Sequence, residues 1–147
     1  MTHHTMDYPA LMRKRGFRVT PQRQVILDAI CEGGSHTTPE EIYRRVRAKA
    51  PAINRATVYR TLDFLCELRL VVAMRVGDRT YYEIAGERPH HHLVCRTCGA
   101  MIQLDNALLE SLVSSIKRKH HFHVDMDHVG LFGLCEECRR AEARRKL

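Results

Sequence analysis

The sequence predicts an α+β fold in which an N-terminal winged helix-turn-helix is followed by a small α/β dimerisation domain with a four-cysteine zinc site. Three observations lead to this prediction. Helix-start signals recur through the N-terminal half, and a two-residue hairpin signal follows them. Two CxxC pairs then enclose a short strand–helix–strand pattern.

Four helices are expected in the N-terminal half. The first covers residues 10–15 and ends at Gly16, a residue suited to a helix C-terminus. Thr20-Pro21 opens the second helix, with the cap oxygen on threonine and proline at the first helical position. Thr38-Pro39-Glu40-Glu41 opens the third with the pattern of a capping box. The fourth helix runs from Asn54 or Arg55 to Leu68, and its polar face presents Ala56, Tyr59, Arg60 and Asp63.

Two β-type runs follow the helices. Residues 70–76 and 79–84 are separated by Gly77-Asp78, which predicts a hairpin. Helices followed by a two-stranded hairpin are the layout of a winged helix-turn-helix, whose exposed Tyr59/Arg60 face would meet the DNA major groove. Residues 1–86 are therefore predicted to be a winged-helix DNA-binding domain. The net charge of +7 suits a polyanionic partner, although mere solubility explains it equally well.

Residues 87–147 are predicted to form a dimerisation and metal-binding domain. After a hinge at 86–89, we expect strands at 93–94 and 101–104, a helix at 106–119 with Leu109, Leu112, Val113 and Ile116 inward, a strand at 127–134 and a helical tail from 139. This unit has too little core of its own, and a second copy of the chain is the simplest partner.

The two CxxC pairs point to a structural Zn²⁺ ion. Four thiolates at tetrahedral angles suit this metal, and we prefer it to a pair of redox dithiols because the flanking domain lacks core. Cys31 and Cys66 lie in apolar helical settings and are expected to be buried thiols. The predicted zinc ligands are Cys95, Cys98, Cys135 and Cys138.

A second group of candidate ligands lies around the expected hinge. In an extended segment, His90 and His92 point to one side and His91 to the other. Glu83 ends the second strand of the hairpin and could close the same site, together with the distant His36. A mixed N/O ligand set suits Fe²⁺, Mn²⁺, Co²⁺ or Zn²⁺. A solvated polar loop is the alternative, but three consecutive histidines directly before a CxxC pair favour metal.

Other classes of protein fit the sequence less well. An enzyme would need an open metal position and a nucleophile with a partner base, and neither is visible. A zinc-dependent interaction module would leave the Tyr59/Arg60 face and the hairpin without a purpose. No apolar stretch reaches the length of a membrane span, and paired cysteines that suit metal rather than disulfides agree with a cytoplasmic location.

The sequence resembles the ferric uptake regulator (Fur) family over nearly its whole length. The ordered set of motifs is more specific than any one of them. It comprises residues 16–23 (GFRVTPQR), His36 ahead of 39–43 (PEEIY), 56–62 (ATVYRTL), Tyr82-Glu83, 90–99 (HHHLVCRTCG) and 135–138 (CEEC).

The resemblance implies a homodimer that represses transcription by binding inverted-repeat, double-stranded operator DNA when its regulatory metal is loaded. By position, Tyr59 and Arg60 match groove contacts, Arg18 a minor-groove anchor and Arg23 a phosphate contact. The family's metal sites carry over by position as well. The regulatory site would use His36, Glu83, His90 and His92, the structural zinc the four paired cysteines, and a third site His91, Glu110 and His128.

Departures from the family pattern bear on the third site and on the metal. Pro89 stands where many members have another ligand, and His128 is one residue nearer Cys135 than usual. Zinc-sensing relatives usually have a cysteine within the segment that matches 67–94, which contains none here. Peroxide-sensing relatives have aspartate where Gln103 stands. Fe²⁺ is therefore favoured as the regulatory metal, with zinc-, manganese- and peroxide-sensing branches as alternatives.

Overall fold

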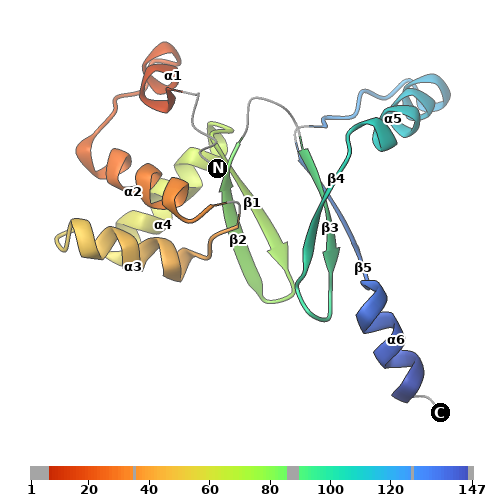
Figure 1. The fold of residues 1–147 in the computed structure, drawn as a ribbon. Helices are drawn as coiled ribbons and strands as arrows, with labels where there is room; N and C mark the ends of the chain where they lie inside the picture. Colours follow the sequence, from red (N-terminus) through yellow and green to blue (C-terminus); the bar gives the residue numbers. More distant parts are fainter. Residues whose placement is uncertain (1–6, 35, 86–89, 127, 146–147) are drawn as a thin grey trace. The chain divides into compact units, whose positions relative to one another are not determined.

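The computed structural model describes residues 7–34, 36–85, 90–126 and 128–145, with the side chain of His128 left out (Figure 1). The chain divides into two compact units, Met1–Glu87 and Arg88–Leu147, and each is treated by itself below. This division falls one residue after the expected boundary. The expected hinge at 86–89 lies outside the described residues.

Unit 1 begins with four helices, whose starts follow their capping residues. They are α1 (Tyr8–Lys14), α2 (Pro21–Glu32), α3 (Pro39–Lys49) and α4 (Arg55–Glu67). Thr20 caps α2 and Asn54 caps α4 through their side-chain oxygens, and the capping box at Thr38 and Glu41 is complete. Helix α1 starts earlier than predicted because Asp7 caps it by accepting a hydrogen bond from Ala10 N at 2.9 Å.

The core of unit 1 lies among α2, α3, α4 and the hairpin that follows them (Figure 1). The apolar residues Val58, Leu62 and Leu65 of α4 are buried, as are Ile42 and Val46 of α3. On α2, the apolar spacing predicts a buried stripe of Val25, Ile26, Ala29 and Ile30. This prediction was partly wrong, since Val25 is only half-buried and Leu27, outside the stripe, is 1% exposed. A helix contacted by both α3 and the hairpin buries a wider face than one stripe.

The hairpin consists of β1 (Val71–Val76) and β2 (Arg79–Ile84), paired antiparallel around Gly77-Asp78 as predicted. Gly77 adopts a φ of +59°, which the tight turn requires. An isolated bridge then joins the hairpin to the loop before α3. Thr37 N donates to Tyr82 O at 3.0 Å, and Tyr82 N donates to Thr37 O at 2.8 Å. Unit 1 is thus a winged helix-turn-helix whose wing is fixed to the base of α3.

Unit 2 contains a three-stranded sheet and two helices. Along the chain, α5 lies between the second and third strands, and α6 follows the third. Its elements are β3 (His90–Cys95), β4 (Met101–Leu104), α5 (Ala107–His120), β5 (His128–Gly133) and α6 (Glu136–Arg145). The strand order is β4-β3-β5, with β3 antiparallel to β4 and parallel to β5. Strand β3 is longer than predicted because its histidines pair with both neighbours, and α6 starts directly after Cys135 rather than at residue 139.

Apolar side chains remain exposed on unit 2. Leu109 is buried on α5, but Leu112 is 53% exposed, so its predicted inward position was wrong. Helix α5 makes few contacts with the strands of unit 2, so they leave this side of the helix uncovered. Among the described residues, no helix has the length and apolar character needed to cross a bilayer.

Candidate metal centres and nucleic-acid interface

The four paired cysteines come together at one end of the sheet in unit 2. Their sulfur atoms all lie within 4.8 Å of one another, and Cys98 Sγ is 3.7 Å from Cys135 Sγ. Two zinc–sulfur bonds of about 2.3 Å at a tetrahedral angle place their sulfurs about 3.8 Å apart. A disulfide would need about 2.05 Å, so the separation fits two ligands of one zinc ion and not a covalent pair.

Local backbone structure places these sulfurs. Cys95 ends β3, and Gly99 N donates to Cys95 O at 3.0 Å in a turn where Gly99 has a φ of +73°. Cys135 N donates to Cys95 Sγ at 3.4 Å, which joins the two CxxC pairs directly. Arg139 N donates to Cys135 O at 2.9 Å, so the second pair lies in the first turn of α6.

The thiols of the cluster have pKa values displaced in opposite directions. Hydrogen bonds from the backbone N–H groups of Cys135 and Cys98 lower the pKa of Cys95 to about 6. Sulfur–sulfur hydrogen bonding, first with Cys135, raises the pKa of Cys138 to about 12. The sulfurs therefore compete for protons that zinc ligation would release, which makes zinc affinity depend on pH.

His36 and Glu83 form a second candidate pair, within unit 1. His36 Nε2 lies 3.5 Å from Glu83 Oε2, and Glu83 is only 5% exposed. The bridge between Thr37 and Tyr82 explains this proximity, because each member of the pair is the chain neighbour of a bridged residue. An imidazole and a buried carboxylate at this distance can act as ligands of one divalent cation.

The three consecutive histidines occupy the first half of β3. The rings of His90 and His92 lie edge to face with centroids 5.0 Å apart, as expected for alternate residues on one side of a strand. His91 is 2% exposed, and burial lowers its pKa. Its Nδ1 accepts a hydrogen bond from Val129 N at 3.2 Å. The third predicted set of His91, Glu110 and His128 stays a prediction, because the side chain of His128 lies outside the described residues.

The residues predicted to contact DNA lie on α2, on α4 and in the loop before α2. Tyr59 and Arg60 are neighbours on α4, and Arg18 is exposed ahead of α2. The Tyr59 hydroxyl donates to Glu40 Oε1 at 3.2 Å. Burial first, and then the charge of Glu40, raise the pKa of Tyr59. The sequence showed no sign of this contact, because it joins two helices and leaves no local pattern.

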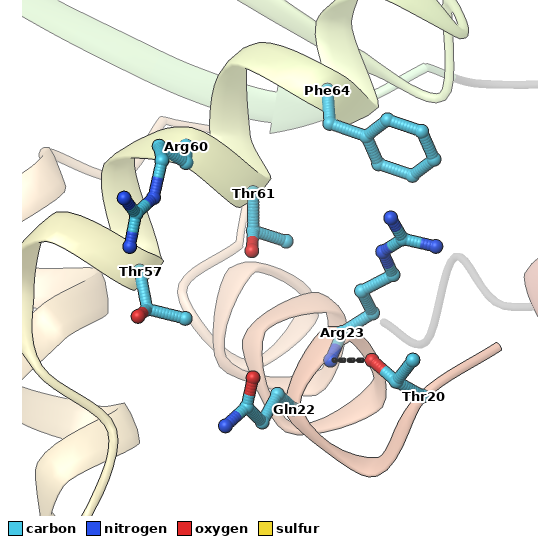
Figure 2. A pocket seen from close by; sticks show the side chains of 7 residues that line it. All are labelled: Thr20, Gln22, Arg23, Thr57, Arg60, Thr61 and Phe64. Atoms are coloured by element: carbon cyan, nitrogen blue, oxygen red, sulfur yellow. Dashed lines mark hydrogen bonds between the residues drawn. The ribbon is translucent and has the colours of Figure 1, made fainter. Parts of the chain in front are cut away.

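A pocket of about 360 Å³ opens between α2 and α4 (Figure 2). Arg23 and Arg60 line it from opposite helices, together with Thr20, Gln22, Thr57, Thr61 and Phe64. Sequence reasoning singled out both arginines but missed Thr61 and Phe64. A polar residue on the buried face of α4 was the available sign, because Thr61 stands three residues after Val58 and four before Leu65.

Comparisons with known proteins agree with this arrangement. The family model described as "Ferric uptake regulator family" matches residues 14–131. The ferric uptake regulation protein of Campylobacter jejuni is 32% identical over 143 residues, which cover 95% of this chain and 91% of that protein.

Solved structures show the same fold. The ferric uptake regulator of Pseudomonas aeruginosa with manganese superposes with a TM-score of 0.75 and 27% identity, over 89% of this chain and 99% of that one. A zinc uptake regulator complexed with zinc and DNA gives a TM-score of 0.61 and 25% identity, over 92% and 93% of the two chains. With the wing, the four-cysteine cluster and the family match in agreement, the chain belongs to the ferric uptake regulator family of metal-responsive transcriptional regulators.

Proposed function

We propose that this chain is a homodimeric repressor that binds inverted-repeat, double-stranded DNA when a regulatory metal, Fe²⁺ for preference, is bound. The observation that carries the proposal is the His36–Glu83 pair, held at 3.5 Å by the bridge between the wing and the base of α3. Because both residues belong to unit 1, which would bind DNA, a metal that they bind would act directly on that unit.

The regulatory site would use His36 and Glu83 from unit 1 with His90 and His92 from unit 2. Two pairs on two units, joined by a short connection, would be ordered relative to one another when all four ligate the same ion. Without metal, the two units would have to be ordered when the chain binds DNA, and the free-energy cost of this ordering would weaken binding. Three imidazoles with one carboxylate suit Fe²⁺, Mn²⁺ or Zn²⁺, and the manganese in the structure of the Pseudomonas aeruginosa relative is consistent with this ligand class.

The structural zinc would be held by Cys95, Cys98, Cys135 and Cys138. The sulfur separations support this role, and four protein ligands leave no open position for catalysis. The ion would fasten the end of β3 to the start of α6, two segments that are far apart along the chain.

A second copy of the chain would cover the exposed apolar surface of unit 2. Ile102, Leu108 and Leu112 are each more than half exposed, and Leu131 and Phe132 are more than 40% exposed. An apolar surface of this kind on a small unit is typical of an interface. Dimerisation would place two copies of α4 at a fixed separation, which an inverted repeat would match.

DNA would be contacted by Arg18, Arg23, Tyr59 and Arg60. The zinc uptake regulator solved with zinc and DNA supports this role, because it is a protein of this fold in complex with DNA. Tyr59 and Arg60 on α4 would read the major groove, Arg18 would reach the minor groove, and Arg23 would contact the backbone.

The test is DNA binding at controlled metal occupancy. Zinc-saturated chain would first select a duplex from a random-sequence pool in the presence of Fe²⁺, and binding to that duplex would then be titrated with Fe²⁺, Mn²⁺ and Zn²⁺. His90→Ala and His92→Ala should abolish the metal-dependent gain in affinity. His120→Ala, an exposed histidine at the end of α5, is the matched control and should behave as the parent. Undiminished binding by the metal-free parent would overturn the proposal.

The structural zinc needs a separate test. Cys98→Ser should release zinc and reduce dimerisation, measured by sedimentation, whereas Cys31→Ser should change neither. Retention of one zinc per chain by Cys98→Ser would contradict the assignment.

A further inference from the structure

We propose that the pocket between α2 and α4 is a seat for a single DNA backbone phosphate, and that Phe64 is the positioning residue that holds Arg23 in it. This proposal rests on the DNA-binding function proposed above, in which Arg23 contacts the DNA backbone. It adds the pocket that receives one phosphate and Phe64 as the residue that positions Arg23.

The lining of the pocket suits an anion. Two guanidinium groups face it, Arg23 from α2 and Arg60 from α4, and Thr57 and Gln22 add polar groups at its edge (Figure 2). None of its seven lining residues carries a carboxylate. The first turn of α2, with Thr20 as its cap, also faces the pocket and contributes the positive end of a helix dipole.

Thr61 adds a hydroxyl to the lining of the pocket. This polar residue is only 8% exposed, although α4 otherwise buries apolar side chains. Its side chain extends from α4 toward α2 and lines the pocket (Figure 2). No side-chain hydrogen bond of Thr61 is found among the described residues. Its hydroxyl lines the pocket and can donate to a phosphate oxygen bound there.

Arg23 is fixed on two sides. Its guanidinium carbon lies 3.9 Å from the centre of the Phe64 ring, and Nη1 donates to Arg18 O at 2.7 Å. The Phe64 ring is itself held by Phe17, at a centroid distance of 5.3 Å and an interplanar angle of 76°. A guanidinium has five N–H donors, so the bond to Arg18 O leaves donors available for a phosphate. Fixing the group in advance lowers the ordering cost of that contact.

The surroundings favour a backbone phosphate over a base edge. Arg23 faces a hollow between two helices, whereas a base reader projects outward into a groove. Phosphate contacts fix the register of a protein on DNA without distinguishing sequences. Loss of the seat should therefore weaken binding to all duplexes alike.

The first experiment compares Phe64→Leu with Phe64→Tyr in the full-length, metal-loaded chain. Phe64→Leu removes the ring and should weaken binding roughly three- to tenfold, equally for the selected duplex and for an unrelated duplex of about 30 base pairs. Binding should also depend less steeply on salt. The magnitude of the negative slope of log affinity against log salt should decrease by up to about 0.9 for each subunit bound. Phe64→Tyr keeps a ring face and should match the parent. Thermal unfolding of all variants separates these effects from a folding defect.

A double-mutant cycle tests whether Phe64 acts through Arg23. Arg23→Gln should weaken binding by at least as much as Phe64→Leu, and the addition of Phe64→Leu to Arg23→Gln should cause no further loss. Additive losses would refute the positioning role, even if both residues affect affinity.

Methylphosphonate substitution tests the ligand itself. Single phosphates of the selected duplex would be replaced one at a time by the neutral methylphosphonate. In the parent, one position per half-site should cause a loss that disappears in Arg23→Gln. If no position behaves in this way, or if Phe64→Leu changes the preference for the selected duplex, the pocket is not a phosphate seat. Failure of the parent to bind any duplex would instead refute the proposed function.

Discussion

One added methyl group at Gly33 would test how the DNA-binding unit supports its metal-ligand pair. Gly33 ends α2 with a φ of −76°, a conformation that alanine also adopts, so only space excludes a side chain here. A Cβ at this position would overlap Thr37 Oγ1 and lie 2.9 Å from Thr37 Cβ. Rotation about χ1 cannot relieve the second contact, and Thr37 is fully buried, so the backbone of Thr37 must shift.

The cost follows from these contacts. Overpacking of a buried site costs about 1–3 kcal/mol. Against this, replacement of glycine by alanine stabilises the folded state by about 0.4–1 kcal/mol, because it lowers the conformational entropy of the unfolded chain. The Gly33→Ala substitution should therefore lower the free energy of unfolding by roughly 1–2 kcal/mol. In a domain of this size each kcal/mol lowers Tm by about 4–8 °C. Because Thr37 adjoins His36 and pairs with Tyr82, the variant should also need more metal for half-maximal DNA binding.

Thermal unfolding followed by circular dichroism measures the first effect, with Gly133→Ala as the control. A Cβ at Gly133 would meet no atom within 4 Å, and this control should change the free energy of unfolding by less than about 0.5 kcal/mol. Thr37→Ala removes the overlapping hydroxyl, so its combination with Gly33→Ala should cost less than the sum of the single changes. A Tm for Gly33→Ala equal to or above that of the parent would refute the packing argument.

Three further predictions concern groups with displaced pKa values. Burial raises the pKa of Cys31 and Cys66 to about 11, so little reactive thiolate is present at pH 8. Both should therefore be alkylated roughly a hundredfold more slowly than an ordinary thiol. Mass spectrometry of the zinc-loaded chain measures this rate. Glu40→Gln should lower the pKa of Tyr59 yet leave it above the usual value, because burial remains the larger cause; ultraviolet titration against Tyr59→Phe measures this. A backbone hydrogen bond within the capping box lowers the pKa of Glu41, so its stabilising effect should be complete above the usual glutamate pKa and lost as the pH falls through the lowered value. Acid unfolding of Glu41→Gln should therefore lack this part of the pH dependence.

Local features of the fold were predictable because local residues cause them. The capping box at Thr38 and the turn at Gly77-Asp78 set the bounds of α3 and of the hairpin through contacts within a few residues. The same holds for the two CxxC pairs, in which each pair places its own sulfurs. The exposure of Leu112 could not be foreseen, because it depends on which surface α5 meets.

The contacts that shape the candidate sites could not be read from the chain. The bridge of Thr37 to Tyr82 and the stacking of Arg23 on Phe64 join elements that are distant in sequence. In each contact only one of the two residues, Tyr82 or Arg23, belongs to a family motif, and no local pattern points to its partner. The resemblance to a family indicated which residues to watch, but the physical support of those residues comes from neighbours that no motif includes.

The proposed metal ligands at the two ends of β3 differ in kind. Imidazoles occupy its first half and a thiolate ligand its last position, Cys95, so at about 3.3 Å per residue the two ends are roughly 17 Å apart. Ions bound at the two ends could not share a ligand, yet a single strand would connect the two proposed sites. If the proposed zinc were lost, the end of β3 next to Cys95 would be held less firmly beside β5, and the histidines of the same strand would be less well fixed. Metal binding at the proposed regulatory site would then depend on the proposed structural zinc.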